Sequence, residues 1–386
     1  MRPFTALRRP GVLLAVLVPL ALLPMTLADG VLAVLLAWSG ALLGLLGVSL
    51  ALQLGMLLGA SLGGGRVTRV GVGVGRLVRE WSTPRRVVAV RAVPVSLSVS
   101  ISPDRLPVRL RLWATGLCSA LAGATAAALP LLGVPDPLWT GALLGGVARI
   151  VHALLPRDTA GSTSTGWLLF RLPRVSGARL AEMEAAPLAR EVTEAVLAGQ
   201  LTEAAAAADR LARARPGTWS TSACQVSVLE ATGRYAKAVA VTMGMVQRGG
   251  DDPRRMSFAL AGLAGLAVSA VEVGQVEPDT GLPVARRAMS DAVRLGYPEH
   301  RLNGTRAALA LLDGDVAASA RLAALAADQS QGPLSRADDL ATLARARMAA
   351  GDNAGAREAL GRAEELAAWW PRVAAVRERL DVGAVR

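Results

Sequence analysis

The sequence predicts a mainly α protein with a membrane domain over residues 1–177 and a helical repeat domain over residues 178–386. Three observations lead to this fold class. Long runs of Leu, Ala, Val and Gly end near residue 156, and 52% of the 386 residues are hydrophobic. A segment between two of these runs alternates apolar and polar residues, as strands do. The second half is Ala-rich, and a short Gly-containing pattern recurs in it.

Four apolar stretches are candidates for membrane spans, because about 20 apolar residues cross a bilayer as a helix. They cover residues 11–28, 31–62, 112–134 and 138–155. The first stretch follows Arg8 and Arg9 and resembles a signal peptide in this respect. We expect it to be retained as a span, because the next apolar run follows at once with no clear cleavage site between them.

The positive charge of the chain predicts its orientation in the membrane. The formal net charge is +12, and arginines gather between the apolar stretches. Residues 63–111 hold ten arginines but only two acidic residues, Glu80 and Asp104. Cytoplasmic loops carry such an excess, so we expect both termini to be cytoplasmic and the protein to be integral to the cytoplasmic membrane. Nucleic-acid binding is not expected, because aromatic residues make up 3% of the chain and no recognition module is present.

The basic segment also predicts a small β region at residues 66–101. Residues 88–101 alternate apolar residues with small or polar ones, which is the period of a half-buried strand. Residues 66–78 are similar and rich in Gly and Val. We expect these strands to lie at the cytoplasmic face of the membrane.

Five short patterns follow one another through the first half of the chain. In order they are Leu52-Gln53-Leu54-Gly55-Met56, the basic Gly-rich turn 63–70, Ala114-Thr115-Gly116-Leu117, Ala153-Leu154-Leu155-Pro156 and Ser164-Thr165-Gly166. Their order and spacing over residues 30–180 resemble those of the site-2 proteases, which are intramembrane zinc metalloproteases. Members of that family carry HExxH on a membrane helix, then a membrane-associated β region, and later an N-x-x-P element and an Asp-Gly pair.

The resemblance implies a protease outline without its metal chemistry. The two His positions of the motif hold Leu52 and Met56, the position of the general base holds Gln53, and the position of the third ligand, an Asp, holds Thr165. Zinc in proteins is held by Cys thiolate, His nitrogen or carboxylate oxygen, and a Met thioether is not such a ligand. We therefore expect an inactive relative with no cofactor. The chain has only two histidines, His152 and His300, and the second falls in the repeat domain. A site of two His and one Asp would therefore need a second chain.

Gln53 is also the one strongly polar side chain in a long apolar run. Such a side chain is costly in lipid unless it has a partner. We expect it to hydrogen-bond another helix or to lie near the membrane face, and we favour the helix contact.

A repeat is visible in the second half of the chain. Its three clear copies start at Gly199, Gly233 and Gly351, each followed five residues later by Ala, and a looser copy starts at Gly314. The first two glycines are 34 residues apart, a spacing that is typical of tetratricopeptide repeats. Tyr235 stands where that family often has an aromatic residue. The segment therefore resembles a tetratricopeptide-like α-solenoid, with the Gly/Pro-rich residues 274–283 expected to form a longer loop; a plain helical bundle is the alternative.

The function expected from these features is that of a binding or regulatory scaffold. Its membrane part would bind another membrane protein, and its repeats, at turn positions such as Gly199, Gly233, Tyr235 and Gly351, would bind a cytoplasmic protein or peptide. Two alternatives remain: a membrane-tethered repeat scaffold without protease ancestry, and an active membrane metallopeptidase with an unrecognised or intersubunit site. Failure of residues 49–60 and 150–170 to meet would favour the first alternative.

Overall fold

The chain folds into two compact units, Met1–Pro187 and Leu188–Arg386. The computed structural model describes residues 30–83, 86–103, 105–134, 136–159, 162–249, 252–330 and 332–384. The division between the units falls within helix α6 (Gly177–Leu197), whose first residue is the last residue of the membrane domain expected from the sequence. The expected first span, residues 11–28, lies outside the described residues.

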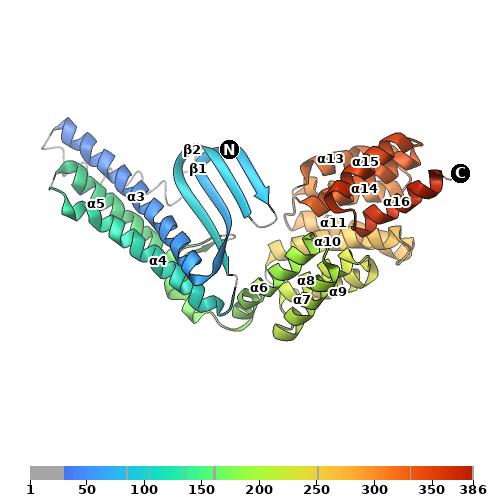
Figure 1. The fold of residues 1–386 in the computed structure, drawn as a ribbon, viewed down its shortest axis with the longest axis horizontal. Coiled ribbons are helices and arrows are strands. Elements are labelled where there is room, and N and C mark those ends of the chain that lie inside the picture. Colours follow the sequence, from blue (N-terminus) through green and yellow to red (C-terminus); the bar gives the residue numbers. More distant parts are fainter. Residues whose placement is uncertain are drawn as a thin grey trace. The chain divides into compact units, whose positions relative to one another are not determined.

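The described part of the first unit combines three long helices with a sheet of long, bent strands (Figure 1). Its elements are α3 (Val31–Gly63), β1 (Gly65–Thr83), β2 (Arg86–Pro103), α4 (Val108–Ala128), η2 (Leu129–Leu132), α5 (Pro137–Leu154), β3 (Asp158–Thr159), β4 (Ser162–Thr163), η3 (Trp167–Arg171) and η4 (Leu172–Arg174). The helices expected at 31–62, 112–134 and 138–155 and the strands expected at 66–101 are all present.

Three helices in the described part of the chain are long and apolar enough to cross a membrane. They are α3, the stretch Val108–Leu132 that joins α4 to η2, and α10 (Pro253–Glu272) of the second unit. The expected span at residues 138–155 forms α5, but this helix is not among the three; it carries Arg149 and His152 in its last two turns. The most apolar stretch of α10 is 61% buried inside the protein, against 28% for each of the other two.

Small residues let α3 pack closely against both neighbouring helices. A Cβ atom at Gly44 would overlap the Ala142 carbonyl oxygen of α5, and one at Gly145 would overlap the Ala41 carbonyl oxygen of α3. Toward α4, a Cβ at Gly59 would lie 2.7 Å from the Cα atom of Thr115. Membrane helices commonly associate through small residues spaced four apart, because these residues let the backbones approach. Gly40, Gly44, Gly141 and Gly145 make two such pairs.

The sheet is more folded than a plain hairpin. Residues 69–72 of β1 pair with residues 97–100 of β2 on one side and with residues 87–90 of β2 on the other. Each long strand therefore contributes two segments, and the segments of the two strands alternate in the order 97–103, 65–72, 86–91 and 77–83. The bend in β1 contains Gly73 and Gly75, whose φ angles of 92° and 90° are favourable only for glycine. The sheet packs against α3 through both strands.

The second unit consists of helices throughout its described residues (Figure 1). After α6 these are α7 (Leu201–Ala214), α8 (Trp219–Ala231), α9 (Tyr235–Arg248), α10 (Pro253–Glu272), α11 (Pro278–Arg294), η5 (Glu299–Leu302), α12 (Asn303–Leu312), α13 (Val316–Gln329), α14 (Pro333–Ala349), α15 (Asn353–Ala367) and α16 (Pro371–Ala384).

Six connections in the described part of this unit have the same backbone conformation. Gly199, Gly233, Gly274, Gly296, Gly314 and Gly351 all have positive φ angles, between 70° and 92°. In each turn the glycine N–H bonds the carbonyl three residues back, and the next N–H bonds the carbonyl five residues back, as Gly233 does to Glu230 and Arg234 does to Leu229. This is the Schellman ending of a helix, which favours Gly. The longer loop expected at residues 274–283 is wrong, because Gly274 makes this turn and α11 begins at Pro278.

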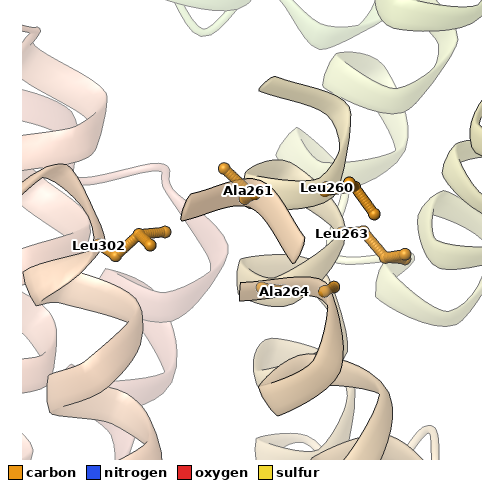
Figure 2. Packing of buried hydrophobic residues seen from close by; sticks show 7 residues of the cluster. Leu260, Ala261, Leu263, Ala264 and Leu302 are labelled. Atoms are coloured by element: carbon orange, nitrogen blue, oxygen red, sulfur yellow. The ribbon is translucent and has the colours of Figure 1, made fainter. Parts of the chain in front are cut away.

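Helix α10 lies at the centre of the second unit and is buried on two sides. Leu260 and Leu263 point to one side, while Ala261 lies toward Leu302 on the other (Figure 2). Farther along α10, Leu266 and Ala270 pack with Tyr235 of α9. Its apolar character is therefore explained by packing against neighbouring helices.

The close packing of α3 and α5 predicts a position-specific cost of one methyl group. Gly44→Ala would force the two helix backbones apart, which should destabilise the first unit by about 1–3 kcal/mol. Gly47→Ala is the matched control, because a Cβ at Gly47 meets nothing within 4 Å; Ala favours helix over Gly by up to about 1 kcal/mol. Thermal unfolding of the purified protein in detergent measures the stability of both variants against the unaltered chain. Equal midpoints for the two variants would contradict the packing.

Candidate functional site

Two of the four positions singled out in the sequence, Leu52 and Thr165, meet at one buried hydroxyl group. Ser119 Oγ of α4 donates a hydrogen bond to the Leu52 carbonyl oxygen at 2.8 Å and lies 3.2 Å from Thr165 Oγ1. Because the hydroxyl hydrogen of Ser119 is used for Leu52, Thr165 is the donor in the second bond. All three residues are buried. The structure thus brings together segments 49–60 and 150–170.

The position of Thr165 is set by the turn before it. Ser164 Oγ accepts hydrogen bonds from the Arg157 and Trp167 N–H groups, at 2.9 and 3.1 Å, and donates to the Leu155 carbonyl oxygen at 2.8 Å. One side chain therefore links the end of α5 to the start of η3. The following residue, Gly166, lies against the Leu154 carbonyl group, where a Cβ atom would not fit.

Gln53 has a different partner from the one expected. Its Oε1 atom accepts a hydrogen bond of 2.9 Å from the Val99 N–H group of β2. The expected contact with another helix is therefore wrong, and the amide instead joins α3 to the sheet. The physical reason is that β2 runs beside this part of α3, so the Val99 N–H group is within reach of the Gln53 amide oxygen.

Met56 lies in an apolar cluster next to Thr165. It packs against Trp167, Leu168 and Leu172, which are buried at the start of η3 and η4. The Leu52 side chain belongs to a second apolar cluster, with Val48 of α3 and Ala127 and Ala153 of the neighbouring helices. Leu52 and Thr165 thus meet at Ser119. The Leu52 and Met56 side chains lie in two separate apolar clusters, and the Gln53 amide bonds the sheet. No group of three or more His, Cys, Asp or Glu that could hold a metal ion occurs among the residues described.

A second polar cluster lies inside the helical unit, around Arg372. The Arg372 side chain is 4% exposed and pairs with Glu272 of α10 at 2.6 Å and with Asp338 of α14. Its Nη2 atom also donates to Thr342 Oγ1 at 2.9 Å. Trp370 Nε1 donates to the same Asp338 carboxylate at 2.9 Å. Charged groups buried to this degree require such pairing.

Burial changes the ionisation of the carboxyl groups near this cluster. It raises the pKa of Glu230 to about 7, and the Asp338 carboxylate adds to the rise. Burial also raises the pKa of Asp339 to about 7, against the opposing effect of a hydrogen bond from Ser330. Burial opposes ionisation of Glu272 too, but the charges of Arg372 and Arg345 outweigh it and lower the pKa of Glu272.

The repeat positions expected to contact a partner are covered by the chain itself or lie at turns. Tyr235 is 2% exposed at the start of α9. Gly199 lies beneath Trp369, and Gly233 lies beneath Pro371, with 3.5 Å between the Pro371 Cβ and a Cβ built at Gly233. No side chain meets a Cβ built at Gly351 within 4 Å.

Two parts of these sites are absent from the sequence-based expectations. Ser119 is a small hydroxyl residue in an apolar span, and its only sequence signal is its polarity there. The Arg372 cluster joins α10, α14 and α16, and no local pattern connects these three helices.

No protein-family model matches the chain, and no curated protein matches it in sequence.

The bond between Gln53 and Val99 predicts how the sheet is held. Gln53→Leu should leave the Val99 N–H group without this acceptor, at a cost of about 1–3 kcal/mol. Hydrogen–deuterium exchange of residues 95–103 in the detergent-solubilised protein should then speed up about tenfold or more. Gln53→Glu, which keeps an acceptor oxygen, is the control with a smaller effect. Unchanged exchange in Gln53→Leu would show that the sheet is held by other contacts.

The raised pKa values predict that the helical unit loses stability as the pH rises. Between about pH 4.5 and 7 the unfolded chain releases the Glu230 proton while the folded chain keeps it. The free energy of unfolding should therefore fall across this window, by about 2 kcal/mol for Glu230, which is partly accessible to solvent. Glu272 is ionised in both states there and adds little slope. Glu230→Gln should reduce this slope and leave the part that Asp339 contributes in the same window. Hydrogen–deuterium exchange of α8 and α10 as a function of pH measures the slope, and a wild-type slope of the opposite sign would refute this assignment.

Proposed function

We propose that the chain is a catalytically inactive relative of the site-2 proteases, joined to a tetratricopeptide-like α-solenoid, and that it acts as a membrane-anchored binding or regulatory scaffold. The membrane unit would bind another membrane protein, and the helical repeats would bind a protein or peptide in the cytoplasm. No cofactor is part of this proposal.

The observation that carries the proposal is the meeting of Leu52 and Thr165 at Ser119. In the family, the segments corresponding to these two residues supply zinc ligands to one site. Two segments separated by a sheet and two helices would not be expected to meet at these positions in an unrelated anchor. The convergence favours protease ancestry over a simple tethered scaffold.

Residue chemistry supports the absence of peptidase activity at this place. A leucine side chain has no donor atom, a thioether is a weak ligand suited to Cu(I), and the Gln53 amide cannot act as the general base near neutral pH. The Gln53 oxygen is also occupied by the backbone of β2. A binding role for the membrane unit is consistent with this retained arrangement without reactive groups.

The repeated turns support a tetratricopeptide-like solenoid. The Schellman turns at Gly199, Gly233, Gly274, Gly314 and Gly351 each join the two helices of one pair, and α10 packs in the interior of that stack. Stacked helix pairs of this kind bind peptides and helices on their inner surface. Under this proposal α10 is a core helix and does not cross the membrane.

Charge and exposure support the proposed topology of four spans with both termini in the cytoplasm. The sheet carries exposed Val78 and Trp81 beside Arg79, whose guanidinium lies 4.8 Å from the Trp81 ring. Exposed apolar and basic side chains together suit the headgroup region of a membrane. This favours a sheet lying at a membrane face, and the arginine excess of residues 63–111 favours the cytoplasmic one.

The proposal predicts a metal-free protein without peptidase activity. Elemental analysis of the detergent-purified full chain should find no zinc bound in stoichiometric amount. A peptidase assay on membrane-protein substrates should give no cleavage that a chelator abolishes. One tightly bound zinc per chain, or chelator-sensitive cleavage, would contradict the proposal and favour an unrecognised or intersubunit site.

A further inference from the structure

The segment between α15 and α16 lies across turns from the beginning of the helical unit. The Trp369 indole covers Gly199, and Pro371 covers Gly233. Immediately after them, Arg372 reaches Glu272 at the end of α10. The last helix is thus fixed to the turns of the first two helix pairs as well as to its neighbours α14 and α15.

The surroundings of Arg372 form a site with an excess of acidic groups. Glu230, Glu272 and Asp338 come from three different helices, and Arg345 is the basic residue among them, paired with Glu272. Electrostatic coupling links Glu230 and Asp338 to Arg372. Without α16, this site would contain three carboxyl groups and one guanidinium group.

The fit of α16 to this site is incomplete. Arg372 Nε and the hydroxyl group of Tyr235 are both buried and have no hydrogen-bond partner among the described residues. A buried donor or acceptor without a partner loses its hydrogen bonds to water and gains none in return. A buried ion pair is in addition a weak source of net stability compared with apolar packing. These features are more typical of a specific contact that a competing ligand can replace than of a contact that only stabilises the core.

We propose that the site formed by Glu230, Tyr235, Glu272 and Asp338 binds an arginine side chain of a partner protein, and that residues 369–384 of this chain are its resident competitor. The inference rests on the proposed role of the helical unit as a binding module and names the partner's chemistry: an arginine that follows an aromatic residue and a proline. The site opens when α16 is displaced.

The chemistry of the contact favours arginine over lysine. Separate guanidinium nitrogens of Arg372 pair with two carboxylates, Glu272 and Asp338, and one of them also reaches Thr342. A lysine ammonium is one compact centre and does not reproduce this fork. The aromatic residue contributes a second donor to Asp338, as the Trp370 indole N–H does here.

The test uses the full chain in detergent and a chain that ends at Ala368. The probe is a fluorescent peptide with the sequence of residues 368–381, together with its Arg372→Ala and Arg372→Lys versions. The shortened chain should bind the wild-type peptide, and the full chain should bind it at least about tenfold more weakly, since its own α16 competes. The affinity of the shortened chain for the Lys peptide should be about tenfold lower, and its affinity for the Ala peptide about a hundredfold lower.

Full-length Arg372→Ala is the second variant, because it keeps α16 while weakening its hold. It should bind the wild-type peptide more tightly than the unaltered full chain does. Full-length Arg377→Ala is the matched control, since Arg377 pairs with Glu364 at the protein surface, and it should behave as wild type.

If neither the shortened chain nor Arg372→Ala binds the peptide, or if the shortened chain unfolds and Arg372→Ala gains no binding, α16 is a structural helix and the inference is wrong. The metal content of the membrane unit is independent of these outcomes. If the peptide does not bind, the proposal of an inactive protease relative is unaffected, and metal analysis still decides it.

Discussion

The close approach of α3 to α4 and α5 is the constraint on which the membrane unit depends. Lipid supplies little hydrophobic drive between helices, so association depends on packing and interhelical hydrogen bonds. Glycines at the contacts bring the backbones near enough for Ser119 of α4 to reach the Leu52 carbonyl oxygen of α3 at 2.8 Å. The same proximity places Thr165 beside Ser119. A wider spacing of these helices would break the contacts that join Leu52, Ser119 and Thr165.

The helical unit is organised by different physics. Local turns repeat, and each Schellman ending reverses the chain with the same geometry, so a stack of helix pairs forms from short-range information. Apolar burial around α10 then holds the stack together. The ionic contacts of Arg372 join residues that lie far apart in the chain, and they fix the last helix against α10 and α14.

Features with a local signal could be predicted from the sequence. Apolar length predicted α3 and α4, and the period of two predicted the sheet; Gly199, Gly233 and Gly351 marked turns because a helix ending of this type requires positive φ. Pro283 misled the prediction of a loop, since proline near the start of α11 is tolerated within the helix. The partner of Gln53 and the ion pairs of Arg372 depend on long-range packing, which no local pattern encodes. Helix α5 carries Arg149 and His152, and it is not among the described helices that are apolar enough to cross a membrane.

The proposal that Leu52, Gln53, Met56 and Thr165 occupy the positions of a site-2 protease metal site is tested most directly by introducing the ligands of that site. The measurement is zinc binding to the full chain with Leu52→His, Gln53→Glu, Met56→His and Thr165→Asp, compared with the same chain lacking the Thr165→Asp change. Because the segments already meet at Ser119, the fourfold variant should bind one zinc ion per chain, and the chain with two protein ligands should bind it far more weakly. A folded fourfold variant that binds no zinc would contradict the assignment.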